Sequence, residues 1–167
     1  MRVTSTQASK IVKELVEKIE NEKVLDRKSR TFLAAMGEDP ETLRPEYDFL
    51  KTSQKIADLE LKLRKIKHAI NVFNVNQKLE GFNMTIDQAL IALPQLTKEK
   101  ARLTEMANML PKERRDSYLN KNIIDYEYVN YDVELVKKEL EETTKLLSGL
   151  QTELNRVNTS VEFEIPD

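Results

Sequence analysis

Cysteine is absent from the 167 residues, histidine occurs once and glycine three times. The absence of cysteine excludes disulfides, thiolate catalysis and cysteine-ligated metal sites. Three scattered glycines cannot form a dinucleotide fingerprint or a phosphate-binding loop. One histidine without cysteine removes the common catalytic triads and zinc sites. We therefore predict a protein that is not an enzyme, with no catalytic residues, no metal and no cofactor. A hydrolase that uses carboxylates remains as an enzymatic alternative.

Long apolar runs are also missing. None approaches the roughly 20 residues needed to span a bilayer, and the start of the chain lacks the apolar stretch of a signal peptide. The formal net charge is only −2, which gives no general attraction to DNA, RNA or an anionic membrane. We expect a cytoplasmic protein whose partners are neither nucleic acid nor membrane.

Charged residues, in contrast, make up 34% of the chain, while aromatic residues make up 6%. High charge with little glycine and proline favours long helices. The length fits one domain, residues 1–167. We predict a mainly α fold, an antiparallel bundle of about four long, coiled-coil-like helices. Apolar residues at spacings of three and four place these helices at about residues 4–25, 45–76, 85–111 and 132–161.

Several local signals refine this pattern. Thr4 with Gln7, and Thr85 with Gln88, have the spacing of a capping box. Pro94 is expected to kink or divide the third helix. Residues 112–115 are predicted to form a polar loop, and residues 31–36 are predicted to form either a helix or a strand. The alternating tail, residues 161–167, could add a strand.

The stretch 122–132 holds three of the five tyrosines and alternates with period two, whereas helical sequence lies on both sides of it. This alternation predicts a short β segment near residues 122–131, with Ile124, Tyr126 and Tyr128 on one face. The tyrosines could form a stacking wall for a ring compound. Alternatively, they are strand residues that cover the end of the bundle.

Two basic clusters follow the first and third helices: one is Arg27, Lys28 and Arg30, and the other is Lys112, Arg114 and Arg115. Up-down connectivity of the helices would bring both clusters to the end of the bundle that carries the tyrosines. Arginine and lysine there could hold a phosphate. The alternative is that the cations complement the helix dipoles and stay solvated.

The candidate ligand-binding residues are therefore basic or aromatic residues at one end of the bundle, with Asn130 among them. They are Arg27, Lys28, Arg30, Arg114, Arg115, Tyr118, Tyr126, Tyr128, Asn130 and Tyr131. His68, with Asn71 and Asn74 nearby on the same helix, is a secondary candidate. Arg64 and Lys65, four and three residues before His68, replace the glutamate of a ferritin-like metal site.

Five stretches resemble the septicolysin-like family of small, uncharacterised helical bacterial and phage proteins. They are Glu46–Phe49, Lys67–Asn74, Met84–Leu90, Asp125–Asp132 and Val161–Ile165. The resemblance runs from about residue 10 to the end of the chain. It implies a helical, self-associating protein and supplies no established activity.

Two hypotheses follow from the sequence. The first is a homo-oligomeric helical binding protein that captures a small anionic, nucleotide-like ligand. Such a protein could sequester a signalling molecule. The second is a structural or adaptor module whose apolar seams recruit another helical protein.

Overall fold

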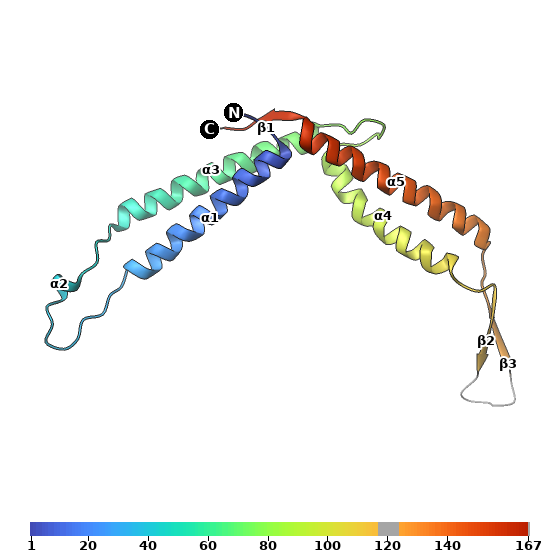
Figure 1. Cartoon of the computed structure of the whole chain (residues 1–167), viewed down its shortest axis with the longest axis horizontal. Helices are drawn as coiled ribbons and strands as arrows, with labels where there is room; N and C mark the ends of the chain where they lie inside the picture. The colour runs from blue at the N-terminus through green and yellow to red at the C-terminus, as the bar shows by residue number, and fades with distance from the viewer. Residues whose placement is uncertain (117–123, 167) are drawn as a thin grey trace. The chain divides into compact units, whose positions relative to one another are not determined.

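The chain is mainly α-helical in the computed structural model, which describes residues 1–116 and 124–166. The helices are α1 (Ser5–Ser29), α2 (Pro40–Leu43), α3 (Phe49–Asn76), α4 (Ile86–Ala107) and α5 (Val133–Ser160). Four short strands join them: β1 (Arg2–Thr4), β2 (Lys112–Asp116), β3 (Ile124–Tyr128) and β4 (Glu162–Glu164) (Figure 1). The long helices lie side by side in pairs, as an antiparallel helical bundle requires.

Contacts separate the chain into two compact units, whereas the length of the sequence predicts one domain. The first unit comprises residues 1–77 and 156–167, and the second comprises residues 78–155. Helix α5 contributes residues to both units. The single-domain expectation stays a prediction, and each unit is described by itself.

Helix α1 begins at a complete capping box, as its sequence predicts. The Thr4 hydroxyl oxygen accepts a hydrogen bond from the Gln7 backbone N–H, and the Gln7 side chain accepts one from the Thr4 N–H. The expected end near residue 25 is wrong, because the helix continues through the basic residues of its last turn to Ser29. Cations there complement the carbonyl end of the helix dipole, which favours the extra turn.

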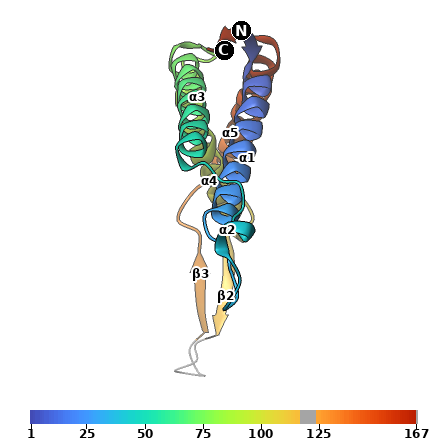
Figure 2. The ribbon, with the colours of Figure 1, turned by 90° about the vertical axis from the view of Figure 1, so that its left-hand side faces the viewer.

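Helices α1 and α3 lie side by side and form the core of the first unit (Figures 1 and 2). Ile66 of α3 is 1% exposed and belongs to one apolar cluster with Ala8 and Leu15 of α1. Salt bridges support the pair further along: Lys23 with Glu60, and Lys55 with Glu22, both at 2.6 Å. Helix α3 begins at Phe49 rather than near residue 45, because the Asp48 carboxylate caps it by accepting from the Lys51 N–H.

The first unit also contains a two-stranded sheet. Strand β4, the predicted tail strand, pairs antiparallel with β1, so that Val3 lies opposite Phe163. The ring of Phe163 stacks on Phe73 of α3 with centroids 4.3 Å apart. This sheet brings the two ends of the described chain together (Figure 2). Strand β1 is not predicted by the sequence, because three residues carry too little alternation to identify a strand.

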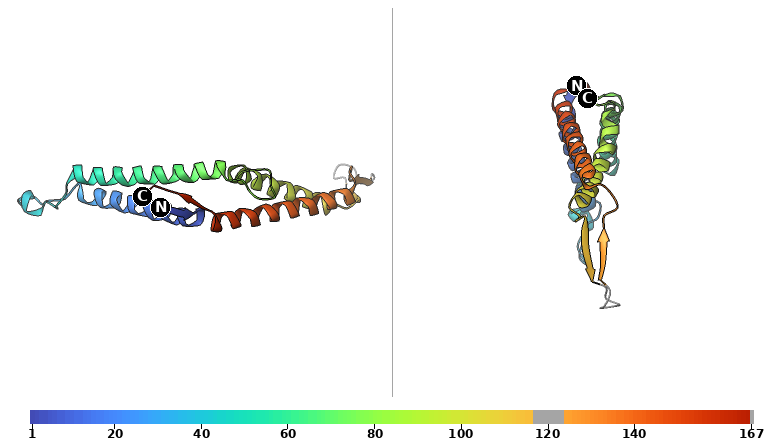
Figure 3. Two further views of the ribbon diagram at one scale, coloured as in Figure 1. Left: turned by 90° about the horizontal axis from the view of Figure 1, so that it is seen from above. Right: turned by 90° about the vertical axis from the view of Figure 1, so that its right-hand side faces the viewer.

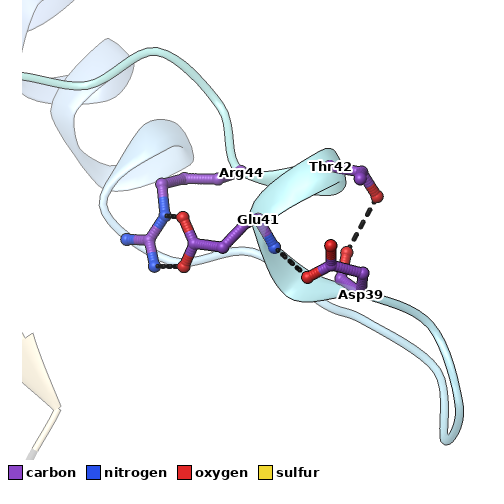
Figure 4. A network of polar contacts seen from close by, with 4 residues as sticks. All are labelled: Asp39, Glu41, Thr42 and Arg44. Atoms are coloured by element: carbon purple, nitrogen blue, oxygen red, sulfur yellow. Dashed lines mark hydrogen bonds and ion pairs between the residues drawn. The ribbon is translucent and has the colours of Figure 1, made fainter.

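The loop between α1 and α3 is ordered by its own polar contacts (Figure 4). Asp39 caps the short helix α2 by accepting from the Glu41 N–H at 3.0 Å. The Arg44 guanidinium forms a forked pair with the Glu41 carboxylate, and this pair lowers the pKa of Glu41. Residues 31–36, predicted as helix or strand, are neither. Leu33 and Met36 are 95% and 107% exposed.

Helices α4 and α5 lie side by side in the second unit (Figures 1 and 3). Their seams bury Leu103 of α4 and Val136, Leu147 and Leu150 of α5. Helix α4 begins at the predicted capping box of Thr85 and Gln88, and it ends at Ala107 rather than at residue 111. Pro94 does not divide it, because the proline removes one hydrogen bond while the packed seam keeps the helix continuous.

Candidate binding surface

The tyrosine-rich segment forms strand β3 of a β-hairpin, and its partner strand is β2. The β segment predicted near residues 122–131 is confirmed for Ile124–Tyr128. The predicted polar loop at residues 112–115 is wrong, because these residues form β2. Ladder hydrogen bonds join backbone groups and do not require apolar side chains, so the charged sequence Lys112–Asp116 can still form a strand.

The base of the hairpin is fixed to the ends of α4 and α5. The Val129 N–H donates to the carbonyl oxygen of Pro111 at 3.3 Å. The Tyr131 hydroxyl donates to the carbonyl oxygen of Met106 at 2.8 Å and contacts Met109 Sδ at 3.1 Å. The Asp132 carboxylate then caps α5, as predicted, by accepting from the Glu134 N–H at 2.9 Å. Tyr131 is therefore held in a structural contact.

One face of the hairpin combines aromatic and cationic side chains. In the antiparallel register Lys112 lies opposite Tyr128, and Arg114 lies opposite Tyr126. The Lys112 ammonium lies 4.0 Å from the ring centroid of Tyr126 and 5.4 Å from that of Tyr128. Tyr126 is 48% exposed and Tyr128 is 61% exposed. This face, which we call the Lys112–Tyr126 face, presents a cation beside two accessible rings.

The opposite face of the hairpin is acidic. Glu113 lies directly across from Glu127, and like charges at such a position oppose strand pairing. Both carboxylates line a hollow of about 560 Å³ at the base of the hairpin, together with Met109, Leu110 and Tyr128. Carboxylates in this hollow disfavour an anion, so an anionic ligand would have to use the Lys112–Tyr126 face.

The basic cluster after the first helix is partly neutralised. Arg27 pairs with Glu20 at 2.8 Å, and Arg30 lies 3.9 Å from Asp26. Lys28 is exposed on the last turn of α1. The hollow next to this cluster, about 420 Å³, is lined by Glu22, Asp26, Glu46 and Asp48, among others. Its acidic lining does not suit a phosphate.

The two predicted basic clusters belong to different units: residues 27–30 to the first, and residues 112–115 to the second. Their convergence on one site therefore stays a prediction. The structure does bring Arg114, Tyr126 and Tyr128 together on one hairpin. Asn130 is exposed just after it. Tyr118 and the side chain of Arg115 lie outside the described residues.

The secondary candidates lie on α3. His68 and Asn71 are exposed and Asn74 is half-buried. Asn71 lines a hollow of about 320 Å³ between α1 and α3, together with Ser9, Val12, Lys67 and Ile70. Across residues 1–116 and 124–166, no three acidic or histidine side chains come together as metal ligands.

Two features of the sequence contribute to neither of the two hypotheses above. One is the run from Leu61 to Leu79, which carries four lysines and one arginine but no acidic residue. The other is the pair Leu33 and Met36, apolar residues that do not belong to the apolar seam of any predicted helix. Both signals can be read from the sequence by comparing charge and periodicity over the same window.

The comparisons with known proteins bear on the fold. No family model matches the chain, and no curated protein matches it. A crystal structure of a functionally unknown conserved protein from Corynebacterium diphtheriae is similar, with a TM-score of 0.57 and 18% sequence identity. The match covers 98% of this chain and 100% of that chain. At this identity the match shows a shared helical fold, and the septicolysin-like resemblance stays a prediction. Among the described helices, none has the length and apolarity to cross a membrane.

Proposed function

We propose that this chain is a non-enzymatic, self-associating helical protein that acts as an interaction module. The observation that carries the proposal is its exposed area. The chain exposes 12769 Å² for a mass of 19.4 kDa. Two separate compact chains of half the mass would together expose about 10,200 Å². The excess surface supports a function in binding other helices.

Apolar side chains contribute to this excess on the long helices. Leu90 and Ile91 of α4 are 49% and 58% exposed, and Leu135 of α5 is 57% exposed. On α1 and α3, Val16 and Val72 are each 46% exposed. Paired helices of this kind bury such residues by adding a further helix. A second copy of the chain is the simplest source of that helix.

Self-association is tested by light scattering coupled to size exclusion over a wide range of protein concentration. We expect a mass above 19.4 kDa that decreases on dilution, and a melting temperature that rises with protein concentration. A constant monomer mass at every concentration would refute the proposal.

A second candidate function is capture of a small anionic ring compound, such as a nucleotide, on the Lys112–Tyr126 face. Its support is the ammonium of Lys112 lying 4.0 Å from the Tyr126 ring centroid. A phosphate could bind the cation, while a ring could stack on an accessible tyrosine. The open surface limits affinity, because solvent screens a charge-assisted bond there.

Calorimetry against mono-, di- and cyclic nucleotides tests this candidate. Lys112→Ala and Tyr126→Ala should each weaken binding, and added salt should weaken it as well. Arg27→Ala is the informative comparison: it leaves binding unchanged if the hairpin acts alone, and weakens it if the two basic clusters converge. Absence of binding to every nucleotide would rule the candidate out.

A further inference from the structure

A groove between α1 and α3 has an apolar floor and a cationic side. Val12 and Ile70 line the floor of the 320 Å³ hollow, and Lys67 lines its side. Val16, one turn further along α1 from Val12, is 46% exposed. Helices α1 and α3 pack through one seam, and this groove is the flank of that seam. We call it the Val12–Lys67 groove.

Two cations lie along α3 at this groove: Lys67 lines it, and Arg64 lies one turn before Lys67. Arg64 and Lys67 are exposed and lie three residues apart, so they share one stripe of α3. Among the described residues, neither forms an ion pair within 4 Å. The nearest acidic residue along α3 is Glu60, which lies one turn before Arg64 and pairs with Lys23 at 2.6 Å; the hydrogen bond from Lys23 and, to a smaller extent, the charge of Arg64 lower the pKa of Glu60. Two such grooves would repel each other, whereas a stripe that carries negative charge beside apolar residues would complement this one.

Helix α5 presents a matching stripe. Leu135, Glu139, Glu142 and Leu146 follow at spacings of four, three and four residues and therefore lie on one face. Leu135 and Leu146 are 57% and 45% exposed, and both glutamates are exposed. Within the described chain, Glu139 and Glu142 form no ion pair within 4 Å. The neighbouring Lys145 pairs with Glu141.

The stripe on α5 is distinct from the seam that α5 buries. Val136, Leu147 and Leu150 are between 0% and 8% exposed. At ~100° per residue, Val136 and Leu147 lie about a quarter turn from Leu135 and Leu146, and Leu150 lies about 40° from Leu146 toward the buried seam. The stripe can therefore meet another helix while the buried seam stays intact.

We propose that the Leu135–Leu146 stripe of one copy packs into the Val12–Lys67 groove of a second copy. The inference rests on the proposed self-association and names its surfaces. The two leucines would cover the apolar floor, and the two glutamates would face the cations. Glu139 and Glu142 are three residues apart, as are Arg64 and Lys67. Each pair therefore spans about 4.5 Å along its helix axis, and the charges can meet in register.

Charge reversal tests this contact, measured by sedimentation velocity over a range of concentrations. Lys67→Glu places three carboxylates together and should weaken assembly about tenfold or more, and Glu142→Lys should do the same. Combining both changes in one chain restores an opposite-charge pair between copies and should recover assembly. Lys67→Glu should not unfold the chain, because the new glutamate can pair with Arg64 three residues before it.

Lys65→Glu is the matched control. It makes the same change of charge on the same helix, two residues from Lys67 and therefore on a different face. The proposal expects this variant to assemble like the wild type. It is overturned if Lys67→Glu also assembles like the wild type, if Lys65→Glu weakens assembly equally, or if the double variant stays defective. A monomeric wild type would instead overturn the proposed self-association.

Discussion

The Tyr131 hydroxyl donates a hydrogen bond to the carbonyl oxygen of Met106, 2.8 Å away, and so ties the start of α5 to the last turn of α4. Tyr131→Phe removes this bond and leaves the rest of the ring in place. We expect a loss of about 1 kcal/mol in the free energy of unfolding, the usual contribution of one hydrogen bond. Urea unfolding measures it.

Tyr128→Phe is the matched control for that measurement. It removes the same hydroxyl from a ring that is 61% exposed, where water can take the place of any partner. We expect a change within about 0.5 kcal/mol. Equal losses in the two variants would contradict the structural role of Tyr131.

Stacking of Phe73 on Phe163 links α3 to strand β4, with an angle of 12° between the rings. A double-mutant cycle with Phe73→Leu and Phe163→Leu isolates the contribution of the pair. We expect a coupling energy of about 0.5–1.5 kcal/mol, typical of such aromatic pairs. A coupling energy of zero would mean that the two rings stabilise the fold independently.

Ile66 is buried in the seam between α1 and α3, and its side chain is 1% exposed. Ile66→Ala removes apolar contacts and leaves a cavity, so it should destabilise the fold by about 2–5 kcal/mol. Leu61→Ala on the same helix, where the side chain is 43% exposed, should cost much less. If both variants melt at the same temperature, the assignment of the seam is wrong.

Tyr47 donates a hydrogen bond to the Asp26 carboxylate at 2.6 Å. That hydrogen bond, then partial burial and the charge of Asp26, raise the pKa of Tyr47. The folded chain therefore holds the phenol proton more tightly than the unfolded chain does. This contribution to stability is complete below the ordinary tyrosine pKa of about 10. It is lost as the pH rises through the raised pKa of the folded chain.

The test compares the unfolding of the wild type and of Tyr47→Phe at a series of alkaline pH values. The wild type should be the more stable at neutral pH, and the difference should shrink as the pH rises above about 10. A difference in unfolding free energy that stays constant up to about pH 12 would show that the Tyr47 proton contributes nothing to stability.

The sequence predicted those parts of the fold that depend on neighbouring residues. The capping boxes at Thr4 and Thr85 and the cap at Asp132 each need only a side chain and an N–H two or three residues away. The alternation of residues 124–128 likewise identified β3 from one short segment. Because such signals depend only on neighbouring residues, they do not change with the way the rest of the chain packs.

The candidate site was less predictable. Lys112 lies beside Tyr126 because β2 pairs with β3. The residues Lys112–Asp116 show no alternation of apolar and polar side chains that would predict a strand. Arg27 and Arg30, predicted as ligands for a phosphate, lie beside Glu20 and Asp26 instead. A cation in the sequence does not reveal whether a carboxylate already neutralises it.

The sequence by itself determined the four long helices, the caps at Thr4, Thr85 and Asp132, strand β3 and the tail strand, because helical hydrogen bonds and side-chain periodicity act over a few residues. Only the tertiary structure decided that β1 pairs with β4 across more than 150 residues, that β2 is a strand, and that Leu33 and Met36 stay exposed. The physical reason is that backbone hydrogen bonds between strands do not depend on side-chain identity. The partner of a strand is therefore fixed by where distant segments meet.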